Sequence, residues 1–333
     1  MATRDPEKNF EALWETFHNR YPFFALRNVD WKAQYDLYKP QVTSATSDDE
    51  LFDILCRMLD PLNDGHVELE ARIGGRKRYF TAEKPTRFNR EFTEREIRQL
   101  FKTTGKTLVA NGLERPARTQ AWMLRYARSR AFGYMRILEL EGIKKHKLTA
   151  ALDRIARDFR DLRGFIIDIR DNPGGDDSTA IAIINRFCDR KRVAFHRRTK
   201  IGPADDAFKP LRTWHIEPEG EIQFTGPIVV LTCESVFSGG EAFALAIRQL
   251  PYVTILGDHT NGIFSYQLEK KLPNGWEYCL SYQEYLSPDM VSYEGKGVPA
   301  DIELFNTKAD LESGVDPLII RALELLNSRA SDA

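Results

Sequence analysis

The sequence predicts an α/β fold in which helices cover parallel strands, preceded by an N-terminal helical domain. From residue 133 onward, short apolar strands such as "GFIIDI" and "GPIVVLT" alternate with helical stripes, an order typical of parallel strands joined through helices. In the first sixty residues, apolar side chains instead recur at helical spacing. We therefore expect three consecutive segments: a helical domain at 1–70, a basic connecting segment at 71–130 and an α/β core at 131–330.

The bulk composition indicates a globular protein without a charge bias. The 333 residues include 48 Lys and Arg against 49 Asp and Glu, so the formal net charge of −1 favours neither nucleic acid nor anionic membrane as a partner. No apolar run approaches the roughly 20 residues that span a bilayer. We expect a periplasmic or extracellular protein if an export signal has been removed, and a cytoplasmic one otherwise. The four cysteines form no CxxC pair, so we expect neither a zinc site nor a disulfide framework. We expect no other metal and no cofactor.

The predicted N-terminal helices lead to a loop that carries a histidine. The stretch "FEALWETFHNRY" places its large apolar residues on one helical face. Ser47 and Glu50 form a capping box that begins the helix "LFDILCRML", and Pro61 ends it. The loop "LNDGHVELE" then places His66 at a transition from helix to strand.

The connecting segment is strongly basic. Residues 72–130 contain 16 Lys and Arg against 5 Asp and Glu, and Thr93 with Glu96 forms a second capping box that begins a short helix. Aromatic residues do not alternate with these charges, as a nucleic-acid surface with stacking platforms would require. We therefore interpret the segment as a solvated cationic face.

The stretch "VFSGGE" places Ser238 where an apolar strand ends and a helix begins. Such a corner exposes a side-chain oxygen and turns backbone N–H groups toward one point, as a nucleophile of acyl transfer requires. The helix N-terminus and the N–H of Gly239 would stabilise the oxyanion that forms when a carbonyl is attacked. A serine that only caps the helix would give the same local pattern.

A second loop, "DIRDNPGG" at 168–175, also follows a strand and also contains two adjacent glycines. Gly174 and Gly175 allow the backbone to approach a ligand closely, and each presents an N–H. Many α/β proteins use Asn-Pro-Gly turns only as connections, so this loop alone is weak evidence of a site.

These motifs occur in the order strand, glycine loop, helix, then strand, serine turn, helix, followed by "ILGDHTNG" and "YEGKGVPADIEL". This order resembles the core of the C-terminal processing peptidases, or tail-specific proteases, and in particular their tricorn-like and interphotoreceptor retinoid-binding-protein-like branches. The resemblance covers about residues 130–305, and "DGHVELE" extends it toward residue 10. It implies a crotonase/ClpP-like core, Ser238 as nucleophile and an oxyanion hole made by Gly239 with Gly174 or Gly175.

The resemblance departs from the simplest family pattern at the general base. Members that use a Ser-Lys dyad carry the lysine in "TFGKG", but the corresponding stretch here is "TNGIF", with Ile263 in the lysine's place. The tricorn-like branch uses an early histidine and a late glutamate, which correspond to His66 and Glu294. Imidazole suits this role because it exchanges protons near neutral pH. Asp64 is a further relay candidate, and His259 is a rival base.

The resemblance therefore implies a serine peptidase that acts on a peptide or protein substrate through an acyl-enzyme. The segment before the core is too short for a PDZ domain with its connections, so we expect substrate selection by other surfaces. Two alternatives stay open: a non-catalytic module that binds hydrophobic ligands, and an acyl-CoA enzyme of the crotonase type. The sequence indicates no oligomeric state.

Overall fold

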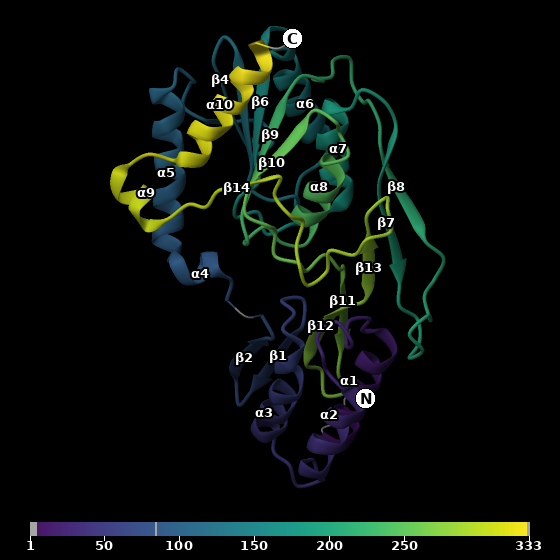
Figure 1. The fold of residues 1–333 in the computed structure, drawn as a ribbon. Helices are drawn as coiled ribbons and strands as arrows, with labels where there is room; N and C mark the ends of the chain where they lie inside the picture. Colours follow the sequence, from purple (N-terminus) through teal and green to yellow (C-terminus); the bar gives the residue numbers. More distant parts are fainter. Residues whose placement is uncertain (1–4, 84, 332–333) are drawn as a thin grey trace. The chain divides into compact units, whose positions relative to one another are not determined.

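The computed structural model describes residues 5–83 and 85–331, and the chain forms two compact units (Figure 1). The first unit comprises Met1–Lys84, Arg197–Arg212 and Ser265–Tyr285; the second comprises Pro85–His196, Thr213–Phe264 and Leu286–Ala333. The segments predicted at 1–70, 71–130 and 131–330 are consecutive, whereas the first unit includes two stretches from late in the chain. Early and late residues thus share one hydrophobic core.

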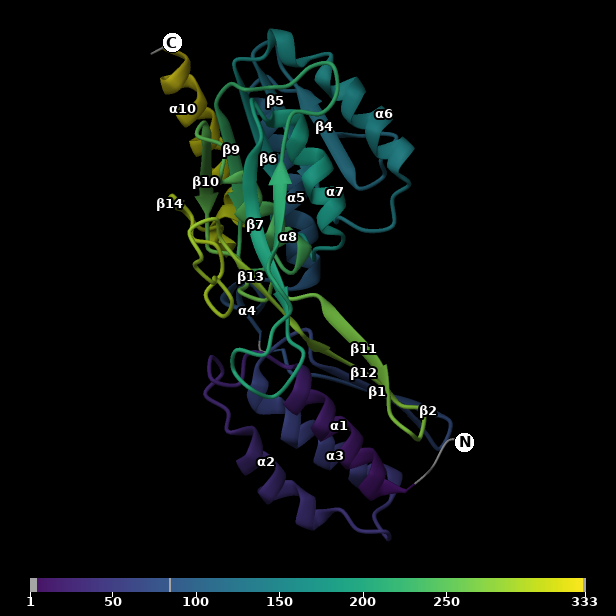
Figure 2. The same cartoon turned by 90° about the vertical axis from the view of Figure 1, so that its right-hand side faces the viewer.

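The first unit packs helices against one face of a four-stranded antiparallel sheet of order β11-β12-β1-β2 (Figure 2). Leu55, Leu69 and Leu280 are fully buried in the core between them. The predicted capping box is confirmed, since Ser47 and Glu50 exchange hydrogen bonds at the start of α3. The elements are α1 (Pro6–Arg20), α2 (Trp31–Tyr38), η1 (Lys39–Gln41), α3 (Asp48–Leu59), η2 (Asp60–Leu62), β1 (Glu68–Ile73), β2 (Arg76–Thr81), β11 (Gln267–Lys271) and β12 (Glu277–Ser281).

The second unit is built on a seven-stranded sheet of order β14-β10-β9-β6-β5-β4-β3. The pairs from β14 to β5 are parallel, whereas β4 and β3 extend the sheet antiparallel. The strands β6 and β9 are buried along their whole length, which explains their continuous apolar sequences. The strands are β3 (Ala117–Arg118), β4 (Leu124–Arg128), β5 (Phe132–Ile137), β6 (Gly164–Asp168), β9 (Ile228–Thr232), β10 (Val253–Gly257) and β14 (Ile302–Glu303).

Helices cover both faces of this sheet (Figure 1). On one face, α5 and α10 pack on the strands through a core that includes Leu108, Ile166 and Leu318, and α6, α7 and α8 lie on the other face. The predicted α/β architecture with parallel strands under helices is confirmed. The helices are α4 (Arg87–Glu91), α5 (Glu94–Ala110), α6 (Lys145–Ala156), η3 (Phe159–Asp161), α7 (Asp177–Ile184), η4 (Asn185–Phe187), α8 (Gly239–Ile247), α9 (Lys308–Ser313) and α10 (Pro317–Ser331).

A three-stranded sheet of order β13-β7-β8 contains β7 (Arg192–Thr199), β8 (Arg212–Ile216) and β13 (Gln283–Leu286).

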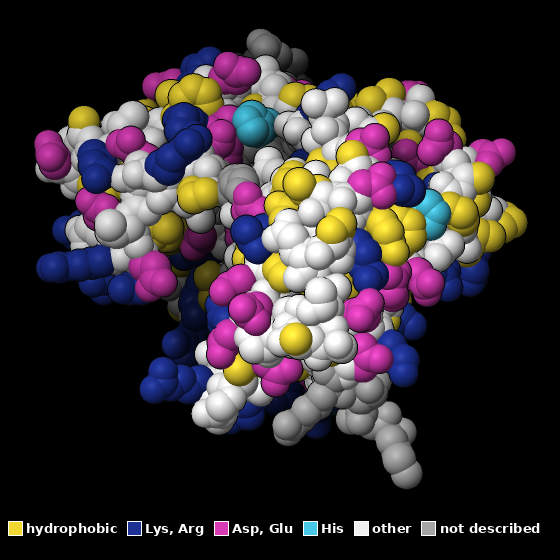
Figure 3. Space-filling model, turned by 90° about the horizontal axis from the view of Figure 1, so that it is seen from below, with side chains coloured by type: hydrophobic (Ala, Val, Ile, Leu, Met, Phe, Trp, Pro, Cys, Tyr) yellow, Lys and Arg dark blue, Asp and Glu magenta, His cyan; other side chains and the backbone are white. Residues whose placement is uncertain are grey.

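Among residues 5–83 and 85–331, no helix is both long and apolar enough to cross a bilayer. On the face drawn in Figure 3, acidic and basic side chains are interspersed.

One helix of the basic segment differs from its prediction. The capping box of Thr93 and Glu96 is confirmed, but α5 extends over 17 residues and is not short. Its buried face includes Thr103, Thr104 and Thr107. Because these side chains are polar, the apolar periodicity of the sequence did not indicate the full length of the helix. Thr104 and Thr107 donate hydrogen bonds to the carbonyls four residues earlier in α5, which satisfies these buried hydroxyls.

Candidate active site

The turn between β9 and α8 holds Ser238 in a strained conformation. Its φ of 53° and ψ of −122° are unusual for a residue with a side chain, and such conformations cost about 1–3 kcal/mol. Ser238 occupies the N-cap position of α8, yet its side chain makes no capping hydrogen bond. Its backbone N–H donates to the carbonyl of Ile263 at 3.1 Å. The half-buried hydroxyl therefore has no part in capping the start of α8.

The glycine loop after β6 contacts this turn through its backbone. Gly174 and Gly175 both have positive φ, 97° and 127°. A Cβ on Gly174 would lie 2.6 Å from the nitrogen of Gly239, and one on Gly239 would lie 2.3 Å from the oxygen of Gly175. Side chains at these positions would overlap the opposite backbone, so the approach of the two loops requires glycine.

The hydrogen bonds distinguish the two candidate glycines of this loop. The N–H of Gly174 donates to Asn172 Oδ1 at 2.8 Å, and Asn172 Nδ2 donates to the carbonyl of Ile137 at 2.9 Å. Within the part of the chain that the structure describes, the N–H groups of Gly175 and Gly239 have no acceptor. The pair available to a bound oxygen is therefore Gly175 with Gly239.

Glu241, in the first turn of α8, fixes the neighbouring turn at 260–263. This fully buried carboxylate accepts hydrogen bonds from the Thr260 hydroxyl and from the N–H groups of Gly262 and Ile263, each at 2.6 Å. Burial raises the pKa of Glu241 to about 7, against the opposing effect of these hydrogen bonds. Because the Ile263 carbonyl holds Ser238, Glu241 positions the serine turn indirectly. The sequence showed the Ser-x-x-Glu spacing but gave no sign of this role.

Glu294 contacts the same turn at Phe264, the residue after Ile263. Its carboxylate is almost fully buried, and Oε2 accepts from the N–H of Phe264 at 3.0 Å. Ile263, which stands in the lysine's place, is buried and contributes only its backbone to these contacts. The turn at 260–264 therefore joins Ser238 and Glu294 through adjacent backbone groups.

His66 and Asp64 belong to the first unit, whereas Ser238 and Glu294 belong to the second. Asp64 is fully buried and accepts from the backbone N–H of His66 at 2.9 Å and from the Tyr21 hydroxyl at 3.0 Å. Burial lowers the pKa of His66 to about 4, and the charge of Asp64 acts in the opposite direction. The imidazole is consequently neutral at pH 7.

A family model described as "Peptidase family S41" matches residues 131–304, just over half of the chain. The chain belongs to peptidase family S41. A second model, "Tricorn protease C1 domain", matches residues 2–60. The resemblance inferred from the motifs, including its tricorn-like character, is therefore confirmed.

Curated relatives of this S41 chain include carboxy-terminal processing proteases. The carboxy-terminal processing protease CtpA of Bacillus subtilis is 26% identical over 171 residues, which are 51% of this chain and 34% of that protein. The chain thus aligns with about a third of that relative's length. The structure of a candidate peptidase from Parabacteroides merdae has a TM-score of 0.83 at 26% identity, with 99% of each chain covered. Mature CPAF complexed with lactacystin shares the fold, with a TM-score of 0.70 at 11% identity and 99% of each chain covered.

His259, the rival base, lies beside the carboxylates of Glu234 and Asp258. Its Nδ1 is 2.7 Å from the carbonyl oxygen of Thr260, and its Nε2 is 3.5 Å from Glu234 Oε1. Within the described residues, neither ring nitrogen bonds to Ser238. The structure therefore directs both nitrogens of His259 toward other groups.

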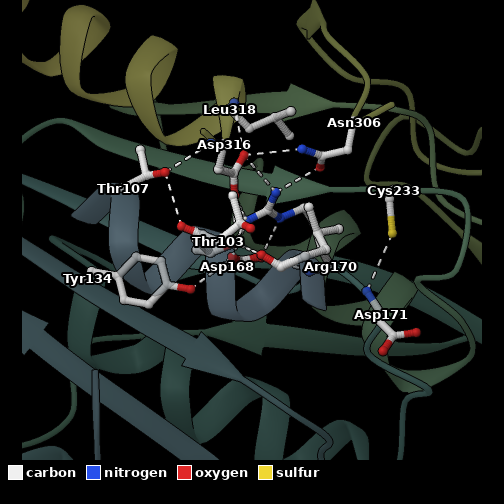
Figure 4. A network of polar contacts seen from close by, with 12 residues as sticks. Thr103, Thr107, Tyr134, Asp168, Arg170, Asp171, Cys233, Asn306, Asp316 and Leu318 are labelled. Carbon is white, nitrogen blue, oxygen red and sulfur yellow. Dashed lines mark hydrogen bonds and ion pairs between the residues drawn. The ribbon is translucent and has the colours of Figure 1, made fainter. Parts of the chain in front are cut away.

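A buried ionic network lies directly before the glycine loop of the S41 core (Figure 4). Arg170 is fully buried and donates to both oxygens of Asp168 at 3.0 and 2.7 Å, to Asp316 Oδ2 at 2.9 Å and to Asn306 Oδ1 at 2.8 Å. The Tyr134 hydroxyl donates to Asp168 Oδ2 at 2.9 Å. Burial alone would lower the pKa of Arg170, but the two carboxylates outweigh it and hold the pKa well above its usual value. The network anchors the start of the loop to β5 and to the segment before α10.

Proposed function

We propose that this chain is a serine peptidase that hydrolyses peptide or protein substrates through an acyl-enzyme at Ser238. The observation that carries this proposal is the strained backbone of Ser238, whose hydroxyl does not cap α8. Beside it lie two backbone N–H groups without an acceptor among the described residues, those of Gly175 and Gly239. A serine that only caps a helix, or a module that only binds hydrophobic ligands, requires neither feature.

In the proposed first step, the Ser238 oxygen attacks the carbonyl carbon of the scissile bond while its proton passes to a general base. The carbonyl oxygen becomes an oxyanion, which the N–H groups of Gly175 and Gly239 and the positive end of α8 stabilise. The C–N bond then breaks, the base returns the proton to the leaving amine, and an ester remains on Ser238. Water attacks this ester by the same route, which releases the acid and restores the serine.

His66 is the proposed base, with Glu294 as its partner. A lowered pKa keeps the His66 imidazole neutral and able to accept a proton, but it also makes the ring a weak base. A carboxylate beside the ring would stabilise the imidazolium as it forms, and this is the role proposed for Glu294. Asp64 accepts one hydrogen bond on each oxygen, from the Tyr21 hydroxyl and from the backbone N–H of His66, and its charge raises the pKa of His66 against the effect of burial.

The nucleophile is tested by the rate of cleavage of a casein-like, unfolded substrate. We expect Ser238→Ala to lower kcat by about 10⁴-fold or more, with an unchanged circular dichroism spectrum. Ser235→Ala, in the same turn as Ser238, is the matched control, because the Ser235 hydroxyl donates to Asn89 Oδ1 of α4. A Ser238→Ala variant with the wild-type rate would exclude this nucleophile.

The relay is tested by a double-mutant cycle on the same substrate. His66→Ala and Glu294→Gln should each lower kcat with little change in KM, and the double variant should be little worse than His66→Ala because the two act as a unit. Additive effects would remove Glu294 from the relay and make Asp64→Asn the next variant. Loss of activity in His259→Ala, with His66→Ala near the wild-type rate, would transfer the role to His259.

A further inference from the structure

Three potential metal ligands lie at the carboxyl ends of two neighbouring strands of the second unit. Glu234 follows β9, and Asp258 and His259 follow β10 directly. The two strands are parallel neighbours, so both ends lie at the same edge of the sheet (Figure 1). The side chains of Glu234 and Asp258 are 13% and 10% exposed, whereas that of His259 is 46% exposed. An ion could therefore enter from the histidine side.

The hydrogen bond at Nδ1 defines the tautomer of His259. A carbonyl oxygen can only accept, so the 2.7 Å contact with the Thr260 oxygen places a proton on Nδ1. The other nitrogen, Nε2, is then directed at Glu234 Oε1, 3.5 Å away, and at Asp258 Oδ1, 3.8 Å away. Arg87 supplies one positive charge to these two carboxylates, because it pairs with Asp258 and its Nε lies 4.0 Å from Glu234 Oε1.

The distances from His259 Nε2 to the two carboxylate oxygens fit a shared metal ion better than a direct hydrogen bond. A charge-assisted hydrogen bond from a protonated Nε2 would be about 2.7–2.9 Å long, and both observed contacts are longer. Ligands bound at about 2.0–2.1 Å to a tetrahedral ion are separated by about 3.4 Å, close to the distances found here. The three ligand atoms all lie within 4.8 Å of one another.

The surrounding contacts orient each ligand. The Nδ1–H bond to a backbone carbonyl is the usual outer contact of a metal-binding histidine. Glu234 Oε2 accepts from the N–H of Phe88 at 3.0 Å, and Asp258 Oδ2 pairs with Arg87. The other oxygens, Glu234 Oε1 and Asp258 Oδ1, lie on the side of the ring, and Asp258 Oδ1 also accepts from the backbone N–H of His259 at 2.9 Å. With Arg87 the carboxylates give the cluster a net charge of −1, and three protein ligands leave a fourth position for water.

We propose that Glu234, Asp258 and His259 bind a divalent transition-metal ion such as Zn²⁺, whose ordinary ligands include imidazole nitrogen and carboxylate oxygen. Sequence spacing could not indicate this site, because its ligands come from the ends of two strands. The ion would connect the turn that carries Ser238 with the turn at 258–263. One hydrogen bond already joins these two turns, from Asn261 Nδ2 to the carbonyl of Glu234 at 3.1 Å. The inference holds whether or not the chain is a peptidase.

The test is a titration of the metal-stripped full chain with Zn²⁺ at pH 7.5 by isothermal calorimetry, with thermal unfolding as a second measurement. We expect one ion per chain, a rise in Tm with Zn²⁺ concentration because the ion binds the folded state, and no comparable rise with Mg²⁺. His259→Ala should weaken Zn²⁺ binding by about 10–100-fold or more, and Glu234→Gln should weaken it similarly. His146→Ala, which removes an exposed histidine of α6, is the matched control and should bind like the wild type.

Each outcome decides for or against the site. Equal Zn²⁺ affinity in the wild type and in both cluster variants would show adventitious binding elsewhere and overturn the proposal. Absence of stoichiometric binding to the wild type would also overturn it. Circular dichroism without metal checks that the variants are folded, and Asp258→Asn replaces any variant that is not.

Discussion

Arg170 and His66 are both buried ionisable side chains, and burial has opposite outcomes at the two. Around Arg170, the carboxylates of Asp168 and Asp316 outweigh the cost of burial, so the pKa rises well above its usual value and the charge is kept. Around His66, Asp64 only partly opposes burial, the pKa falls to about 4, and the ring is neutral. A completed ionic network stabilises the fold, whereas a neutral buried imidazole keeps the capacity to accept a proton.

The largest expected effect is at the completed network. Arg170→Met should lower the free energy of unfolding by about 3–5 kcal/mol, because Asp168 and Asp316 would remain buried without their cation. Urea denaturation at pH 7 measures this change. Arg163→Met is the control at an exposed arginine and should have no measurable effect. Equal stability of the two variants would contradict the structural role given to the network.

The buried His66 ring should make the free energy of unfolding depend on pH. Its pKa is about 6.5 in the unfolded chain and about 4 in the fold, so the unfolded state binds more protons between these values. The stability of the wild type relative to His66→Asn should therefore fall by about 3 kcal/mol as the pH drops from 6.5 to 4. Urea denaturation across this range measures the difference, with His146→Asn as an exposed control. A pH-independent difference would show that the ring is not buried neutral.

Glu241 is a third buried ionisable group, and it should respond in the opposite direction. Burial raises its pKa to about 7, so the folded state binds more protons than the unfolded state between pH 4.5 and 7. The stability of the wild type relative to Glu241→Gln should decrease as the pH rises through this window, by no more than about 3 kcal/mol. An increase over the same window would mean that its three hydrogen-bond donors keep the carboxylate ionised.

The smallest expected effect is a gain in stability. Ser238→Gly should raise the free energy of unfolding by about 1 kcal/mol, because relief of about 1–3 kcal/mol of strain exceeds the backbone entropy of about 0.5–1 kcal/mol that glycine adds. Asp171→Gly is the matched control at a φ of 61°, a conformation that Asp adopts more readily, and should gain less. A larger gain at Asp171 would contradict the assignment of functional strain to Ser238.

Local patterns in the sequence predicted several elements of both units. The capping boxes at Ser47 and Thr93 and the apolar strands β6 and β9 depend on residues close in sequence, and all were predicted correctly. The inclusion of residues 265–285 in the first unit depends on strand pairing across about 200 residues, which local periodicity does not encode.

The details of the candidate site depend on contacts between distant residues. Gly174 and Gly175 were equivalent in the sequence, and only the capture of the Gly174 N–H by Asn172 separates them. The role of Glu241 likewise depends on a turn about twenty residues away, whose N–H groups it accepts. The sequence therefore identified candidate residues, whereas their hydrogen-bond states required the fold.

The measurement that tests the account most directly is labelling of the purified chain with a fluorophosphonate probe, followed by intact-mass spectrometry and peptide mapping. An activated serine beside an oxyanion hole reacts with such a probe, whereas an ordinary serine does not. The account predicts one adduct per chain on the peptide that contains Ser238, no adduct in Ser238→Ala and slower labelling in His66→Ala. A wild-type chain that stays unlabelled, or that is labelled at another serine, would contradict it.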